Sequence, residues 1–414
     1  MQTNLAPEFK GTRDGQAAEA ILRKCVHCGF CTATCPTYQL LGDELDGPRG
    51  RIYLMKQVLE GAPVTRSTQQ HLDRCLTCRN CETTCPSGVE YGHLVDIGRK
   101  IVEERVQRPL GERLLRGALK EGLTSPLFGP AMKLGQWVRP LLPAALKAKV
   151  PPRSGARAHQ WPQREHPRKV LMLLGCVQPG MMPNINSATA RVLDAAGIQT
   201  LVADGAGCCG ALRTHLNDTE GGLADMRRNI DAWWPLVQGL TSQGRVEALV
   251  MNASGCGVTV KDYGHALAHD PDYADKARAV SALTRDLSEL LPDLVPHLLP
   301  KMGGLKTRRL AFHPPCTLQH GQQLRGGVEQ HLAALGFEVQ IAGSESHLCC
   351  GSAGTYSVLQ PVLSRQLRDR KLAQLAPLDA QTIISANIGC IQHLQTGTTT
   401  PVKHWVEVLD EALA

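Results

Sequence analysis

Two stretches decide how the N-terminal part of this sequence folds: CVHCGFCTATCP at 25–36 and CLTCRNCETTCP at 75–86. Each reads C-x2-C-x2-C-x3-C-P. This spacing is typical of bacterial iron–sulfur proteins, in which the fourth cysteine of one run ligates the other cluster. We therefore expect two [4Fe–4S] clusters. Their predicted metal ligands are Cys25, Cys28, Cys31 and Cys85 for cluster 1, and Cys75, Cys78, Cys81 and Cys35 for cluster 2.

A pair of structural zinc sites is the plain alternative, because such sites also use C-x2-C spacing. Zinc needs four ligands and has no use for a third C-x2 step or for the trailing Cys-Pro, and both features occur twice here. The pattern therefore favours iron–sulfur clusters over zinc. His27 and Arg79 are expected to be solvated or to surround the clusters, because thiolates already complete both sites.

The residues around the two runs predict helices. Thirty-nine residues separate the last cysteine of the first run from the first of the second, which is long for a compact ferredoxin built of strands. Arg49–Leu59 has apolar residues at helical spacing, a second helix is predicted to begin near Thr68, and a third covers Tyr91–Val106. We expect residues 1–109 to form an all-α ferredoxin-like domain.

The remaining eight cysteines form an internal repeat. The first cysteines of the two halves are 140 residues apart, the vicinal pairs 141 and the last cysteines 134. These candidates for an additional cluster or for redox thiols are Cys176, Cys208, Cys209 and Cys256, then Cys316, Cys349, Cys350 and Cys390. Buried structural cysteine is the alternative. All eight follow predicted strands or lie in Gly-rich turns, which favours metal or redox chemistry.

Both halves show the same order of predicted elements. The strands are Arg168–Leu171, Ile198–Ala203 and Val246–Met251, then Arg308–Ala311, Phe337–Ile341 and Thr382–Ala386, with helices over Asn184–Ala196 and Gly327–Leu335. Ligands bind at the carboxyl ends of strands in parallel sheets, so each half should gather its thiols at one edge. We predict a multidomain α and α/β protein with two pseudo-symmetric α/β Cys-Cys-Gly domains, 168–300 and 301–414.

Composition limits the remaining function classes. The 414 residues carry a formal charge of +7 without a dense basic tract, which argues against a nucleic-acid partner. Sixteen cysteines, with a polar start at Met1–Lys10 that is no secretory signal, indicate a cytosolic protein with metal or redox thiols rather than a disulfide framework. The uncharged stretches 170–190 and 380–402 are too broken to span a bilayer.

Basic residues raise two further questions of partner binding. Residues 110–167 are expected to be a basic, Pro-rich connector. Contact of the basic segment 108–157 with an acidic partner or an anionic membrane is the alternative. Arg49 and Arg51 are expected on an exposed helix face, with docking of an acidic partner as the alternative.

Longer runs carry a family resemblance. They are CVHCGFCTATCPTYQLLGDELDGPRGRIYLMKQVLEG, HLDRCLTCRNCETTCPSGVEY, NIDAWWP, ASGCG and SHLCCGSAGTY, at 25–61, 71–91, 229–235, 253–257 and 346–356. The sequence resembles the iron–sulfur subunits of bacterial glycolate oxidase, which are related to heterodisulfide reductase and to the iron–sulfur subunits of anaerobic glycerol-3-phosphate dehydrogenase. The resemblance covers most of the chain; only about 110–167 lies outside it.

The resemblance implies an electron-transfer subunit. Separate FAD-binding subunits would oxidise glycolate to glyoxylate, with D-lactate as a further substrate, and this chain would pass electrons to a quinone or another acceptor. It implies FAD only on the partners, a hetero-oligomer, a chain that is inactive alone, and a location in the cytoplasm or at the cytoplasmic face of the inner membrane. A lactate or glycerol-3-phosphate dehydrogenase subunit and a heterodisulfide-type thiol enzyme are the alternatives.

One departure from the heterodisulfide pattern concerns the second set of cysteines. That pattern ends each repeat with C-x2-C, but here Ala253 and Asn387 replace the first cysteine of the pair. Four thiols per half still allow a conventional cluster or a site across both halves. His313 is a candidate extra ligand, although a strand-end histidine more often makes an ordinary hydrogen bond. No catalytic residue is predicted: Gly205–Gly207 lacks the nucleotide-binding pattern, and no Ser/His/Asp set or Cys–His pair stands at recognisable spacing.

Overall fold

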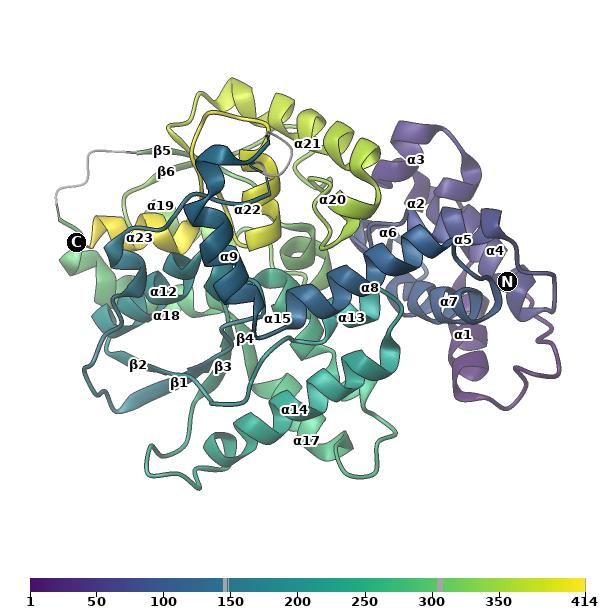
Figure 1. The fold of residues 1–414 in the computed structure, drawn as a ribbon, viewed down its shortest axis with the longest axis horizontal. Helices are drawn as coiled ribbons and strands as arrows, with labels where there is room; N and C mark the ends of the chain where they lie inside the picture. The colour runs from purple at the N-terminus through teal and green to yellow at the C-terminus, as the bar shows by residue number, and fades with distance from the viewer. Residues whose placement is uncertain (144–146, 148, 304–307, 414) are drawn as a thin grey trace.

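The computed structural model describes residues 1–143, 147, 149–303 and 308–413. Helices α1–α7 gather at one end of the molecule, and two sheets with their helices form the other (Figure 1). The N-terminal helices are α1 Arg13–Lys24, α2 Phe30–Ala33, α3 Pro36–Leu41, α4 Pro48–Leu59, α5 Arg66–Asp73, α6 Asn80–Thr84 and α7 Tyr91–Arg105. The expected all-α module is confirmed, including the three helices anticipated before and after the second cysteine run.

The helices of this module pack around a buried apolar core. Leu22 of α1, Met55 of α4 and Leu94 of α7 are all at most 1% exposed. Helices α4 and α7 approach closely at Gly98, where an added Cβ would lie 2.4 Å from the Met55 sulfur. This core fixes the loops that carry the eight N-terminal cysteines, because each loop begins or ends at one of these helices.

Among the described residues, two all-parallel sheets of four strands form the framework of the rest of the molecule. Their strand orders are β2-β1-β3-β4 and β6-β5-β7-β8, which are the same order in each half. The strands are β1 Arg168–Met172, β2 Ile198–Leu201, β3 Ala248–Met251, β4 Thr284–Asp286, β5 Arg309–Phe312, β6 Glu338–Ile341, β7 Thr382–Ser385 and β8 Val402–His404. The predicted duplication is confirmed, and each half has one more strand than the three expected.

The two halves share one apolar core. Val170 and Val250 of the first sheet and Phe312 of the second belong to the same buried cluster, together with Leu193 and Trp405. Helices α12 (Pro183–Ala195) and α23 (Trp405–Ala412) pack against each other within it. The halves are therefore fused, and their strand ends keep a fixed relation.

Further helices pack on the sheets, some on an outer face and others, among them α18 and α19, within the shared core. They are α14 Thr219–Gln238, α15 Ser254–Lys261, α16 Tyr263–Ala266, α17 Ala274–Leu283, α18 Leu291–Leu298, α19 Gly327–Ala334, α20 Tyr356–Leu359, α21 Pro361–Leu375 and α22 Ile388–Gln395. Alternate residues of β1 face opposite cores: Val170 faces the shared core and Leu171 packs under α14. Burial on both faces is typical of parallel sheets.

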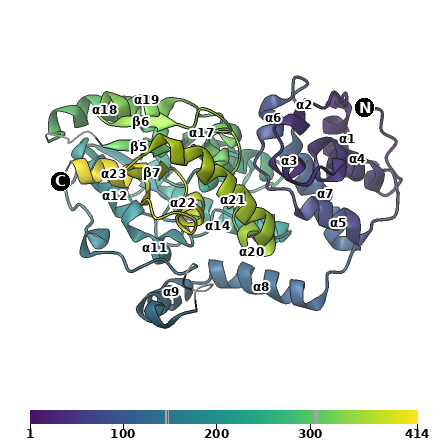
Figure 2. The same ribbon diagram turned by 90° about the horizontal axis from the view of Figure 1, so that it is seen from above.

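Where the structure describes it, the segment expected to be a connector includes the helices α8 Leu110–Thr124 and α9 Phe128–Trp137. Both lie along one edge of the molecule (Figure 2). No helix in the described ranges has the length and apolar character needed to cross a membrane.

Candidate metal centres

The thiols of Cys25, Cys28, Cys31 and Cys85 line one cavity, here called site 1. Cys25 follows the last turn of α1, and Cys85 follows the last turn of α6. Cys28 is exposed, whereas Cys25 is buried. Site 1 therefore lies near the surface, with one thiol open to solvent.

A second cavity, site 2, is lined by Cys35, Cys75, Cys78 and Cys81. Both cavities also have Pro48, Cys81 and Tyr91 in their walls, so the sites are direct neighbours. The fourth cysteine of each run lies in the cavity of the other run, as the crossed ligand assignment requires. The assignment of individual ligands stays a prediction.

The two cysteine loops have matching backbone conformations. His27 and Gly29 have φ of 56° and 85°, and Thr77 and Arg79, at the same places in the second run, have φ of 53° and 59°. Left-handed backbone is costly for non-glycine residues and is typical of functional loops. In the second run it lets a backbone N–H approach sulfur, since Thr77 N donates to Cys75 Sγ at 3.4 Å. These loops fit groups that need both thiolate ligands and N–H donors.

A buried guanidinium lies in the wall of site 2. Arg51 is 1% exposed, donates to the His71 carbonyl at 2.7 Å and pairs with Asp46 at 3.4 Å. Burial opposes its charge, but nearby Cys75, Tyr91 and Cys35 raise the pKa of Arg51 above its usual value. The expectation of an exposed Arg51 is wrong: this side chain points inward from α4, while Arg49 stays on the surface.

The clustered thiols need a cation to become thiolates together. Burial, helped by neighbouring Cys25 and Cys28, raises the pKa of the Cys31 thiol to about 11. Burial also raises the pKa of Cys78 and Cys81 well above the usual thiol value. Bound iron supplies the positive charge that holds several thiolates in one small space. The donor set, the loops and the buried Arg51 all fit [4Fe–4S] clusters.

The second set of thiols gathers at the carboxyl ends of the strands, as predicted. Site 3 comprises Cys176, Cys208, Cys209 and Cys256, and site 4 comprises Cys316, Cys349, Cys350 and Cys390. In site 3, hydrogen bonds from Cys176 and Cys209 lower the pKa of Cys208, while its partners' pKa values are raised. In site 4, Cys316 Sγ and Cys349 Sγ are 3.8 Å apart.

The Cys-Cys-Gly turns of the two halves have the same geometry. Gly210 and Gly351 have φ of 92° and 87°, and their N–H groups donate to Cys208 Sγ and Cys349 Sγ at 3.4 Å. A Cβ on Gly351 would lie 2.6 Å from the Ser364 carbonyl oxygen. Both positions therefore favour glycine because their φ angle is positive, and at Gly351 a side chain would also clash with the backbone of α21.

Site 4 lies against site 2. Leu76, Cys316 and Cys349 belong to one buried apolar cluster, against which Cys78 packs. The contact is also polar, because Asn80 Nδ2 donates to the His347 carbonyl oxygen at 3.3 Å. Sites 1, 2 and 4 therefore form a continuous series.

The two positions that depart from the heterodisulfide pattern lie at helix starts. Ala253 precedes α15, and Asn387 precedes α22 with its side-chain amide 3.9 Å from Cys390 Sγ. His313 at the end of β5 has neither ring nitrogen hydrogen-bonded within the described residues. The expectation of an ordinary hydrogen bond for His313 is wrong.

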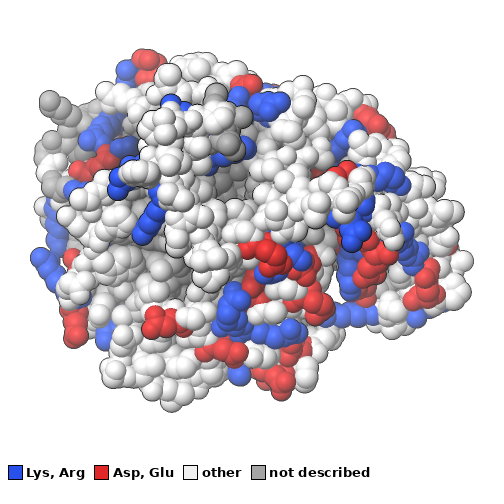
Figure 3. All heavy atoms as spheres, viewed as in Figure 1, with Lys and Arg blue, Asp and Glu red and all other residues white. Residues whose placement is uncertain are grey.

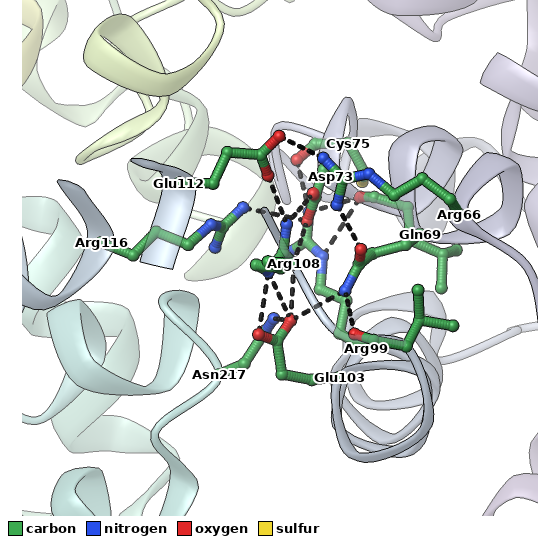
Figure 4. Close-up of polar contacts among 12 residues, drawn as sticks. Arg66, Gln69, Asp73, Cys75, Arg99, Glu103, Arg108, Glu112, Arg116 and Asn217 are labelled. Atoms are coloured by element: carbon green, nitrogen blue, oxygen red, sulfur yellow. Dashed lines mark hydrogen bonds and ion pairs between the residues drawn. The ribbon is translucent and has the colours of Figure 1, made fainter. Parts of the chain in front are cut away.

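An ion network joins the N-terminal helices to α8 (Figure 4). Arg108, whose side chain is 2% exposed, binds Asp73 of α5 through two nitrogens at 2.6 and 2.9 Å and Glu103 of α7 at 2.8 Å. Although burial opposes it, the hydrogen bond from Arg108 and the charge of Arg116 lower the pKa of Asp73. Arg108 and Arg116 thus hold the start of the connector against α5 and α7, and no sequence motif indicated this.

Comparison with protein-family models agrees with this geometry. A model described as "4Fe-4S dicluster domain" matches residues 21–89, and one described as "Cysteine-rich domain" matches 170–261 and 310–395. The "Glycolate oxidase iron-sulfur subunit" of Escherichia coli K12 is 54% identical over all of this chain and 99% of its own length. This chain belongs to the family of glycolate oxidase iron–sulfur subunits.

More distant relatives agree with this assignment. The "Probable glycolate oxidase iron-sulfur subunit" of Bacillus subtilis is 30% identical over 94% of this chain and 91% of its own length. "Lactate utilization protein A" of Bacillus velezensis is 25% identical over 58% of this chain. The family carries iron–sulfur clusters in an oxidoreductase, and the lactate relatives are similar over only part of the chain.

Proposed function

We propose that this chain is the electron-transfer subunit of a complex that oxidises glycolate to glyoxylate. The adjacency of sites 1 and 2, whose cavities share Pro48, Cys81 and Tyr91, supports this most strongly. Bound iron–sulfur clusters exchange single electrons without proton transfer. A chain that holds two of them side by side can take electrons at one end and release them at the other.

Glycolate oxidation itself is assigned to FAD-containing partner subunits, and this chain alone is a non-catalytic subunit. The substrate loses two electrons and two protons; the flavin takes both electrons and returns them one at a time. A quinone or another acceptor receives two electrons and two protons in the end. D-Lactate is a further substrate of the same chemistry.

The surface around Cys28 is proposed as the point of exchange with a partner protein. Cys28 is exposed, and its neighbours Val26 and Phe30 are 67% and 60% exposed. Exposed apolar residues beside a metal ligand are typical of a docking surface. Site 2 lies behind site 1 and is enclosed by site 4 and by α21.

We also propose peripheral membrane association through α8 and α9. Leu114, Leu134 and Trp137 on these helices, and Leu127 just before α9, are between 63% and 73% exposed. The face over α9 is largely uncharged in Figure 3. An amphipathic surface with tryptophan is typical of helices that lie in the bilayer interface. Sedimentation with anionic liposomes should fall sharply for Leu134→Glu/Trp137→Glu, whereas unchanged binding would contradict the proposal.

A heterodisulfide-type reaction is disfavoured by burial. Cys209, Cys349 and Cys350 are 3%, 4% and 0% exposed, so these three thiols offer almost no surface to a disulfide substrate.

Reconstitution with the flavin subunits tests the function. The complex should reduce a quinone with glycolate, and a complex with Cys78→Ala should still reduce its flavin with glycolate but pass no electrons onward. Glycolate oxidation by this chain without partners would contradict the proposed division of roles.

A further inference from the structure

His313 is a buried histidine without an ordinary role. It is 1% exposed, and within the described residues neither Nδ1 nor Nε2 has a hydrogen-bond partner. Buried polar groups are nearly always satisfied, because leaving one unpaired costs free energy. Its backbone is firmly held, since its N–H donates to the Ile384 carbonyl oxygen at 2.8 Å and its own carbonyl accepts from Ser385 Oγ at 2.9 Å. The imidazole is therefore aimed into site 4 by the end of β5.

Two thiols of site 4 complete a compact donor set. One ring nitrogen of His313 and the sulfurs of Cys350 and Cys390 all lie within 4.8 Å of one another. Tetrahedral zinc, with bonds of about 2.3 Å to sulfur and about 2.0 Å to nitrogen, brings its ligand atoms roughly 3.5–3.8 Å apart. A ligand set this close suits one ion held in common.

The N-terminal sites differ from this arrangement. Among the described residues, no three thiols of site 1 or site 2 come as close together as the His313 group. A cubane spreads four thiolates over four separate irons, so its ligands stand further apart. The distances between ligand atoms therefore distinguish sites 1 and 2, which fit clusters, from the His313 group, which fits a single ion.

The surroundings of site 4 balance the charge of such an ion. A zinc ion with His313 and two thiolates is neutral, and a third thiolate, available from Cys316 or Cys349, makes the site −1. Lys371 is 2% exposed beside these thiols, where its charge interacts with Cys350 and Cys349. A buried site is tolerable when its net charge is close to zero.

The first half of the molecule lacks this feature. Leu173 takes the place of His313 there: its N–H donates to Val250 of β3, as that of His313 donates to Ile384 of β7. The histidine is therefore not needed for the fold of a Cys-Cys-Gly domain. Its presence in one half alone indicates a role specific to site 4.

We propose that His313, Cys350 and Cys390 bind one divalent metal ion of the zinc class, with a fourth thiolate from the same site. This site goes beyond electron transfer between flavin and acceptor. The site can bind its metal whether or not the complex oxidises glycolate. The test below measures metal content rather than electron flow, so the two proposals can fail separately.

The experiment measures zinc, iron and sulfide in the full chain, purified anaerobically from zinc-supplemented cells. Wild type should hold roughly one zinc per chain besides the iron of its clusters. His313→Leu, which copies the first half, should lose that zinc and keep the iron. His393→Gln is the matched control, because His393 is also buried in this half but bonds to Ser364 instead of the thiols; it should keep the zinc.

A second variant, His313→Cys, distinguishes loss of a metal ligand from misfolding of His313→Leu. It replaces nitrogen by another ligand, so it should retain zinc while X-ray absorption changes from mixed nitrogen–sulfur to all-sulfur ligation. Wild type without zinc, zinc that His313→Leu leaves unchanged, or an all-sulfur wild-type spectrum would overturn the proposal. Iron with sulfide in place of zinc at site 4 would overturn it as well.

Discussion

At the scale of single residues, the cysteines could be predicted and their surroundings could not. Ligand spacing in the two N-terminal runs is a local pattern, so the eight thiols and their crossed grouping follow from the sequence. Arg51 offers no such signal, because one position on a helix decides whether a guanidinium faces water or a metal site. The structure shows that Arg51 faces site 2.

Removing the charge of Arg51 should lower the reduction potential of the cluster at site 2. Reduction adds a negative charge there, and a buried guanidinium stabilises it by on the order of 1–2 kcal/mol at ~10 Å and an effective dielectric constant of ~20. Arg51→Gln should therefore lower the potential by several tens of millivolts, as ~60 mV corresponds to about 1.4 kcal/mol per electron. EPR-monitored redox titration measures this.

Two matched variants check that charge is the cause. Arg51→Lys should shift the potential much less, because it keeps the cation. Arg49→Gln, at a half-exposed side chain that lines site 1 but not site 2, should leave the potential of the site 2 cluster nearly unchanged. Equal potentials in wild type and Arg51→Gln would refute this role.

At the scale of helices and strands, length decided what could be predicted. The strands that run into cysteines are apolar, and their order repeats, so three strands and a parallel sheet in each half were expected correctly. Strands β4 and β8 are only three residues each, too short to show a period of two. Helices α8 and α9 lie in a stretch rich in proline and arginine, and this composition favours the prediction of a loop. The ion pairs that hold α8 in place join residues far apart in the sequence, so no local pattern predicts them.

Breaking the network at Arg108 should destabilise the junction between α5, α7 and α8. Asp73 is 9% exposed, and Asp73→Asn leaves part of a buried guanidinium unpaired, which costs about 3 kcal/mol. Glu112→Gln, at a side chain 40% exposed, should cost less than about 1 kcal/mol. The midpoints of urea unfolding compare the two variants, and an effect of Asp73→Asn as small as that of Glu112→Gln would show that the network is not needed for stability.

At the scale of the whole molecule, a second contact joins the N-terminal domain to the first sheet domain. His93 Nε2 is 3.2 Å from Asp262 Oδ2, and its ring stacks on His265 with centroids 3.9 Å apart. The hydrogen bond to Asp262 raises the pKa of His93, whereas burial lowers that of His265. Other charged groups that act on His93 are Arg79, Asp96 and Glu90.

This contact should make stability depend on pH. Since the folded pKa of His93 is raised, its contribution is fully present below about pH 6.5, the unfolded value, and is lost as pH rises through the folded pKa. The difference in unfolding midpoint between wild type and His93→Gln should therefore be larger at pH 6 than at pH 8.5. A difference that stays constant or grows with pH would contradict this linkage.

The proposed electron transfer through sites 1 and 2 rests on the claim that two neighbouring clusters occupy the N-terminal cavities. The most direct measurement is iron and acid-labile sulfide analysis, with the EPR spectrum of the reduced, anaerobically purified chain. At least eight irons with matching sulfide are predicted, with spectra broadened by coupling between the clusters because the cavities share a wall. Cys28→Ala or Cys78→Ala should each remove about four irons. A colourless chain that holds only zinc at these thiols and no sulfide would contradict the account.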